Sequence, residues 1–114
     1  MGYDYPLSKQ PAFVSNLDRL RKTAPDVATA FRSLREAANA HGPLDAKQRE
    51  LTLLTAFAAT RNEGGFRVHC TRATQAGATL AELEQVVILL LGTSLGLAPT
   101  VEALSWLHDE LGGS

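Results

Sequence analysis

The chain has 114 residues, a length that predicts one domain with a small core. Lysine and arginine number 11 against 12 aspartate and glutamate, and no basic run is present, so the composition argues against a nucleic-acid partner. The single cysteine excludes an intrachain disulfide framework and a cysteine zinc cluster.

No stretch of the sequence has the layout of a signal or a membrane span. Residues 1–6 lack a charged-then-apolar pattern, so we expect no secretory signal there. The longest apolar run, residues 86–91, has six residues and directly follows Glu82, Glu84 and Gln85. We therefore expect a cytoplasmic protein with no membrane partner.

The first part of the chain predicts an N-terminal arm and two helices. Residues 1–10 show no helical period and predict an arm, which leaves residues 11–114 as one helical domain. Pro11 can open the first helix, because its missing N–H would be unpaired there anyway. Pro25 opens a second helix that ends near residues 41–43. The apolar stripes are Phe13, Val14, Leu17 and Leu20 on the first helix, and Val27, Ala30, Phe31, Leu34, Ala37 and Ala38 on the second.

The middle of the chain predicts two helices joined by a glycine turn. Residues 45–48 form a capping arrangement for a third helix, which is apolar on nearly all sides over residues 51–59 and so is expected to be buried. Two adjacent glycines in residues 62–65 are costly inside a helix, so we expect the turn there. A fourth helix should run to Ala76, with Gly77 in the left-handed position after its end.

The last part of the chain predicts two more helices. Residues 79–82 form a capping box for a fifth helix with the stripe Leu80, Leu83, Val87, Leu90 and Leu91. Pro99 opens a last helix. Its inward stripe is Val101, Leu104, Leu107 and Leu111, and Trp106 points away from that stripe. Residues 86–91 are apolar on all sides of the helix. We expect them, together with Trp106, to lie partly in the core and partly at a contact between subunits. Because no segment alternates with a period of two, the fold class is all-α with about six helices.

Two neighbouring helices carry the residues that could perform chemistry. His69 and Cys70 share one helix face with Phe66 and Ala73, so both are predicted to point into the interior. Glu50 on the third helix lies among apolar neighbours, where a carboxylate is costly unless it is paired or protonated. Folding the two helices against each other would bring Glu50 to His69, which suits proton transfer.

Each of these residues also has a structural interpretation. A lone interior histidine is usually a core residue, and Cys70 is most often a small buried apolar side chain. Glu50 could cap a helix end or bridge to Arg61. Arg61 and Arg72 are solvated or interfacial more often than anion-binding. His41 and His108 fall near helix ends.

Three segments resemble the carboxymuconolactone decarboxylase family, which includes the AhpD-like alkylhydroperoxidases. They are residues 44–51, 66–73 and 77–83, and the resemblance covers roughly residues 25–111. It implies an AhpD-like all-helical bundle that assembles as a homotrimer or homohexamer, with sites near subunit contacts.

The two branches of that family imply different chemistry. One decarboxylates 4-carboxymuconolactone without a cofactor; the other reduces peroxides through a Cys-x-x-Cys pair supported by a glutamate and a histidine. In the second branch that glutamate stands nineteen positions before the histidine, and Glu50 and His69 keep this spacing. The redox cysteines correspond to Asn62 and Gly65, so this chain resembles a divergent member that lacks the pair. Gly65 also stands where the decarboxylase branch has an acidic residue, and Asn62 where it has an arginine.

The leading hypothesis is a cofactor-free decarboxylase-like enzyme acting on a small carboxylated or lactone substrate. His69 would be the general acid/base, Glu50 would orient it or pass protons, and Arg61 or Arg72 would hold a carboxylate. One alternative is a peroxidase-like activity in which Cys70 is oxidised to sulfenic acid. Another is a non-catalytic oligomer that binds a ligand or protein. No metal site is expected, although three histidines could meet across chains.

Overall fold

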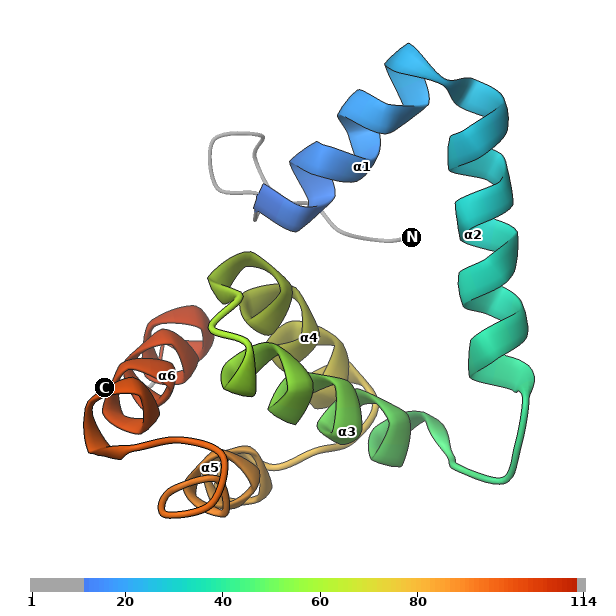
Figure 1. The fold of residues 1–114 in the computed structure, drawn as a ribbon. Coiled ribbons are helices and arrows are strands. Elements are labelled where there is room, and N and C mark those ends of the chain that lie inside the picture. The colour runs from blue at the N-terminus through green and yellow to red at the C-terminus, as the bar shows by residue number, and fades with distance from the viewer. Residues whose placement is uncertain (1–11, 113–114) are drawn as a thin grey trace. The chain divides into compact units, whose positions relative to one another are not determined.

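A computed structural model describes residues 12–112, with side chains from residue 16 onward. In that range the chain forms six α-helices and no strand, which confirms the all-α prediction (Figure 1). The helices are α1 (Ala12–Thr23), α2 (Pro25–Ala40), α3 (Ala46–Ala59), α4 (Glu63–Gln75), α5 (Leu80–Ile88) and α6 (Leu97–Leu111). The predicted arm at residues 1–10, Pro11 and the side chains of Phe13 and Val14 lie outside the described part.

The chain divides into two compact units, Met1–Gly42 and Pro43–Ser114. In the first unit α1 packs against α2, which begins with Pro25 at its first turn as predicted. Ala28 is the one buried residue of α2. The apolar stripe predicted for α2 is mostly exposed, with Val27 at 56% and Leu34 at 63%. This stripe therefore does not fill a core in the described structure.

The second unit is built around α4, which packs against α3, α5 and α6. Its core contains the fully buried side chains of Leu54, Phe66, Leu83, Val87 and Leu107. Predicted capping boxes begin two of these helices: Asp45 pairs reciprocally with Gln48 on α3, and Thr79 with Glu82 on α5. Each box satisfies N–H groups that have no partner inside the helix, so both starts are fixed by local sequence.

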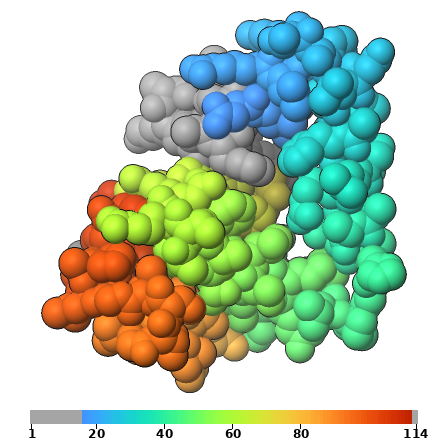
Figure 2. Space-filling view, in the orientation of Figure 1, coloured from blue at the N-terminus to red at the C-terminus, as the bar shows by residue number. Residues whose placement is uncertain are grey.

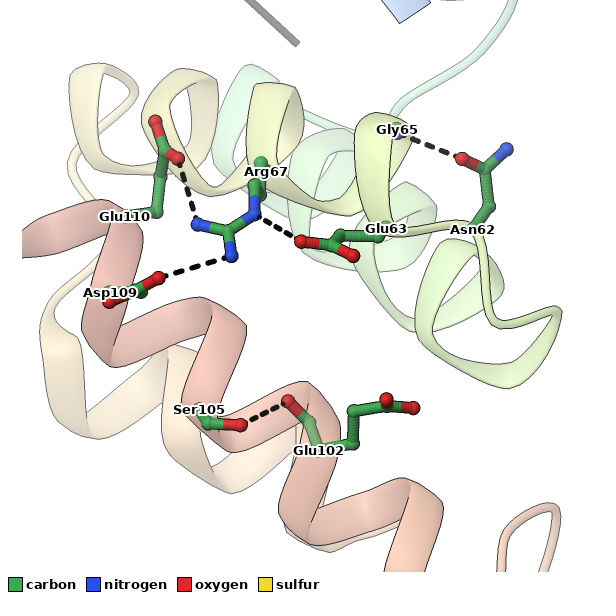
Figure 3. Close-up of polar contacts among 8 residues, drawn as sticks. All are labelled: Asn62, Glu63, Gly65, Arg67, Glu102, Ser105, Asp109 and Glu110. Atoms are coloured by element: carbon green, nitrogen blue, oxygen red, sulfur yellow. Dashed lines mark hydrogen bonds and ion pairs between the residues drawn. The ribbon is translucent and has the colours of Figure 1, made fainter. Parts of the chain in front are cut away.

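The connection between α3 and α4 differs from the predicted glycine turn. Helix α3 ends at Ala59 and α4 begins at Glu63, so Gly64 and Gly65 lie in the first turn of α4. Arg61 supplies the left-handed residue of the turn, with φ 59°. Asn62 then caps α4 by accepting a 3.0 Å hydrogen bond from the Gly65 N–H (Figure 3). The side-chain cap outweighs the low helix propensity of the two glycines.

Two predictions about helix faces are also corrected. Helix α3 is buried on one side only, at Leu54 and Ala58, because α4 and α5 cover that side. On α6, Val101 is 53% exposed, whereas Trp106 packs edge-on against Phe66 with ring centroids 5.6 Å apart. The inward face of α6 is therefore rotated toward Ala103 and Leu107, which are buried.

The end of α5 and the start of α6 expose a group of apolar side chains. Its members, here called the apolar surface, are Ile88, Leu89, Leu91, Leu97 and Val101, each 44–69% exposed. This part of the chain belongs to the orange surface in Figure 2. Residues 85–101 carry no charged side chain. Among the described helices, none is both long and apolar enough to span a lipid bilayer.

Candidate functional site

The packing of α3 on α4 brings Glu50 and His69 together, as the sequence spacing predicts. Nδ1 of His69 lies 2.6 Å from Oε1 of Glu50. The His69 side chain is 6% exposed and the Glu50 side chain 15%, so water screens the pair weakly. Because an ionised carboxylate only accepts hydrogen bonds, Nδ1 donates its proton to Glu50. The geometry is that of a carboxylate that orients an imidazole and determines its tautomer.

Phe57 is a third member of this site, and the sequence analysis assigned it no role. Its ring stacks on the His69 imidazole, with centroids 5.0 Å apart and planes inclined by 24°. Phe57 and Glu50 are seven residues apart on α3, so both project from the same helix face. Helix α3 therefore contacts the imidazole at its edge and on its face.

Cys70 follows His69 on α4 but is fully buried. Burial raises the pKa of the Cys70 thiol to about 12, and the negative charge of Glu110 adds to the effect, while Arg67 opposes it. Because the thiolate is the reactive form, the structure disfavours the single-thiol hypothesis.

Native Cys70 is therefore expected to resist alkylation. A pKa of about 12 against an ordinary 9.0 leaves roughly a thousandfold less thiolate at neutral pH. Iodoacetamide at pH 7 should modify the folded chain at least ~100-fold more slowly than the urea-unfolded chain. Peroxide-dependent dimedone labelling of the folded protein should be absent. Rapid native labelling at Cys70 would restore the thiol mechanism.

The two arginines predicted to hold a carboxylate occupy different places. Arg61 lies in the turn after α3, ~15 Å along the helix axis from Glu50, and pairs with Glu102 at 2.8 Å. Arg72 is half-buried and lies three positions after His69, about one helical turn along α4. Arg72 therefore lies nearer to the Glu50–His69 pair than Arg61 does. A substrate-binding role stays a prediction for both.

Arg67, to which the sequence reading gave no role, joins α4 to α6. Figure 3 shows its guanidinium between Glu63, Asp109 and Glu110. The nitrogen–oxygen distances to these residues are 2.8, 3.2 and 3.5 Å. Burial alone would lower the pKa of Arg67, but hydrogen bonds to Glu63 and Asp109 outweigh it and raise the pKa above its ordinary value. Glu63 lies on α4 itself, but Asp109 and Glu110 come from α6, so spacing along one helix did not reveal the whole cluster.

Replacing Arg67 with methionine is expected to lower the free energy of unfolding by about 1–3 kcal/mol. The change removes a largely buried cation that pairs with one largely buried carboxylate, Glu110, and two exposed ones, while keeping an apolar stem. Arg61→Met is the matched control: its pair with Glu102 is 58% and 45% exposed, so the loss should stay under ~0.5 kcal/mol. Urea denaturation measures both. Equal losses for the two variants would contradict a special role for the Arg67 cluster.

A second histidine–glutamate pair joins α5 to α6. His108 Nε2 lies 2.7 Å from Glu84 Oε2, and both side chains are about one-third exposed. The sequence placed His108 near a helix C-terminus but did not identify its partner. Within residues 12–112, no group of three or more histidine, cysteine, aspartate or glutamate side chains is placed to hold a metal ion.

The structure is that of an all-helical protein with a buried glutamate–histidine pair between two adjacent helices. The chain belongs to the carboxymuconolactone decarboxylase family, whose model matches residues 25–109. No protein of curated function matches the chain.

Two solved structures share the fold. A carboxymuconolactone decarboxylase family protein from Legionella pneumophila is 27% identical, with a TM-score of 0.73 over 90% of this chain and 91% of its own. A family member from Thermotoga maritima, for which involvement in an antioxidative response has been suggested, is 23% identical. Its TM-score is 0.67 over 90% of this chain and 94% of its own.

Proposed function

We propose that the chain is a cofactor-free acid–base enzyme of the carboxymuconolactone decarboxylase type, acting on a small carboxylated or lactone substrate. The observation that carries the proposal is the 2.6 Å contact between Glu50 and a buried His69. Family membership supports the same class of chemistry.

In this proposal His69 moves the proton and Glu50 controls its position. Loss of carbon dioxide from a substrate carboxylate leaves an electron pair on carbon, which must be protonated. The His69 imidazolium gives up its Nε2 proton to that carbon and regains one from water. Glu50 holds Nδ1–H throughout and stabilises the imidazolium through a charge-assisted hydrogen bond. The low exposure of both side chains strengthens this interaction.

Arg72 is the proposed partner of the substrate carboxylate. It is half-buried and lies on α4 one turn beyond His69. A guanidinium recognises a carboxylate through two parallel hydrogen bonds, which would fix the substrate near the dyad. Arg61 already pairs with Glu102 at the far end of α3, so it is the weaker candidate.

Acid–base chemistry fits the site better than thiol chemistry. The antioxidative role suggested for the Thermotoga maritima relative would here need a reactive thiol, and Cys70 is buried with a raised pKa.

We further propose assembly as a homotrimer or homohexamer. The exposed apolar surface at residues 88–101 and the exposed stripe of α2 support it, because both would gain by burial against another subunit.

The test of this function compares two histidine variants on one substrate panel. The panel contains 4-carboxymuconolactone and other small carboxylated lactones, followed by product formation. His69→Gln is expected to lower turnover at least ~100-fold, since it removes the proton donor and acceptor. His108→Gln, which alters the exposed pair with Glu84, should leave turnover within about threefold. Undiminished turnover in His69→Gln would exclude His69 as the acid/base.

A further inference from the structure

Phe57 and Gly65 form a close contact beside the His69 imidazole. A Cβ placed on Gly65 would lie 2.4 Å from two ring carbons of Phe57 and 2.9 Å from its Cγ. Real Cβ atoms essentially never approach another atom so closely. Any side chain at position 65 therefore requires the Phe57 ring to move.

The glycine at this position has no other evident structural reason. Gly65 lies in the first turn of α4, and its φ is not positive, so the backbone does not require glycine. Alanine is the better helix former, and the position is buried. The close approach of the Phe57 ring explains why position 65 is glycine, which helix propensity does not explain.

The position of the ring bears on the catalytic imidazole. A hydrogen bond from Nδ1 to Glu50 fixes one edge of the His69 ring. A stacked ring on its face opposes tilting of the imidazole. Because proton transfer requires alignment of Nε2 with the reacting carbon, the tilt of the imidazole affects the rate.

We propose that Phe57 is a positioning residue for His69, and that Gly65 is the residue that lets the Phe57 ring lie against the imidazole. The proposal rests on the acid–base function proposed above.

The spectroscopic test uses the His69 imidazole itself. Nuclear magnetic resonance of the ring nitrogens and carbon-bound protons reports tautomer, tilt and the ring current of Phe57. Phe57→Leu keeps an apolar side chain but removes the stacking ring, and is expected to shift the His69 proton signals by several tenths of a ppm. Gly65→Ala should produce shifts in the same signals although it leaves Phe57 in the sequence. Unchanged His69 signals in both variants would overturn the proposal.

The stability test asks whether Gly65 matters only because of Phe57. Gly65→Ala is expected to lower the melting temperature in the wild-type background and to leave it unchanged or raised in Phe57→Ala. Gly96→Ala is the control, because a Cβ there meets nothing within 4 Å and φ is −82°. Its small effect should be the same in both backgrounds. An equal loss from Gly65→Ala in both backgrounds would show that Phe57 is not the reason for the glycine.

The kinetic test separates positioning from packing. Phe57→Leu should lower kcat at least ~10-fold with KM within about threefold, because substrate contacts are unchanged and only alignment is lost. A lower melting temperature with unchanged kcat and His69 signals would show a packing role alone. If His69→Gln keeps full turnover, the proposed function fails, and the resonance and melting results still decide whether Phe57 positions the imidazole.

Discussion

Glu50→Gln should lower kcat by about 10²–10⁴-fold while leaving KM within about threefold. Glutamine has the size of glutamate but no charge, so it stabilises the His69 imidazolium far less. Its amide can also donate to Nδ1, which would favour the wrong tautomer of the imidazole. The 2.6 Å contact and the low exposure of both side chains leave little water to compensate for the lost charge. Steady-state kinetics on the best lactone of the panel measures the effect.

Glu84→Gln is the matched control for this variant. It makes the same chemical change in a histidine–glutamate pair of nearly the same length, 2.7 Å, joining α5 to α6. That pair is about one-third exposed, so kcat should stay within about threefold of the wild-type value. If Glu50→Gln behaves like Glu84→Gln, the buried pair is structural and the enzymatic proposal is wrong.

Phe66→Ala should destabilise the fold by about 3–5 kcal/mol. Phe66 is fully buried in the core of the second unit and meets Trp106 of α6 edge-on, so its removal leaves a cavity and ends an aromatic contact. A loss of this size should lower the melting temperature by more than ~10 °C, followed by circular dichroism at 222 nm.

Leu97→Ala is the control for Phe66→Ala. It also truncates a large apolar side chain, but Leu97 is 69% exposed, so the loss should stay within ~0.5 kcal/mol. The comparison belongs at low protein concentration, where any association through the apolar surface is weakest. Comparable losses at both positions would mean that burial in this fold does not determine stability.

Local sequence predicted the features that local interactions determine. The capping boxes at Asp45 and Thr79 were identified because donor and acceptor lie three residues apart, and both form. The meeting of Glu50 and His69 followed from helix periodicity and family spacing, and it is confirmed at 2.6 Å. Their catalytic roles, and that of Cys70, stay predictions.

One local feature, the start of α4, and features that depend on a neighbouring helix were missed. The two glycines suggested a turn, but Asn62 caps α4 and Arg61 takes the left-handed conformation, so the helix begins before them. Trp106 was predicted to lie off the inward face of α6, but it packs edge-on against Phe66 of α4. The Arg67 cluster unites residues more than forty positions apart, which periodicity along one helix does not reveal.

The contact between Phe57 and Gly65 constrains the order in which this site can evolve. A thiol or carboxylate introduced at position 65 collides with the Phe57 ring as it lies here, so the ring must move or residue 57 must become smaller. A change at position 65 alone carries a packing penalty, and under the proposed role of Phe57 a smaller residue 57 alone carries a penalty in alignment of the imidazole. We therefore expect positions 57 and 65 to change together, and libraries that vary position 65 alone to yield fewer stable variants than libraries that vary both.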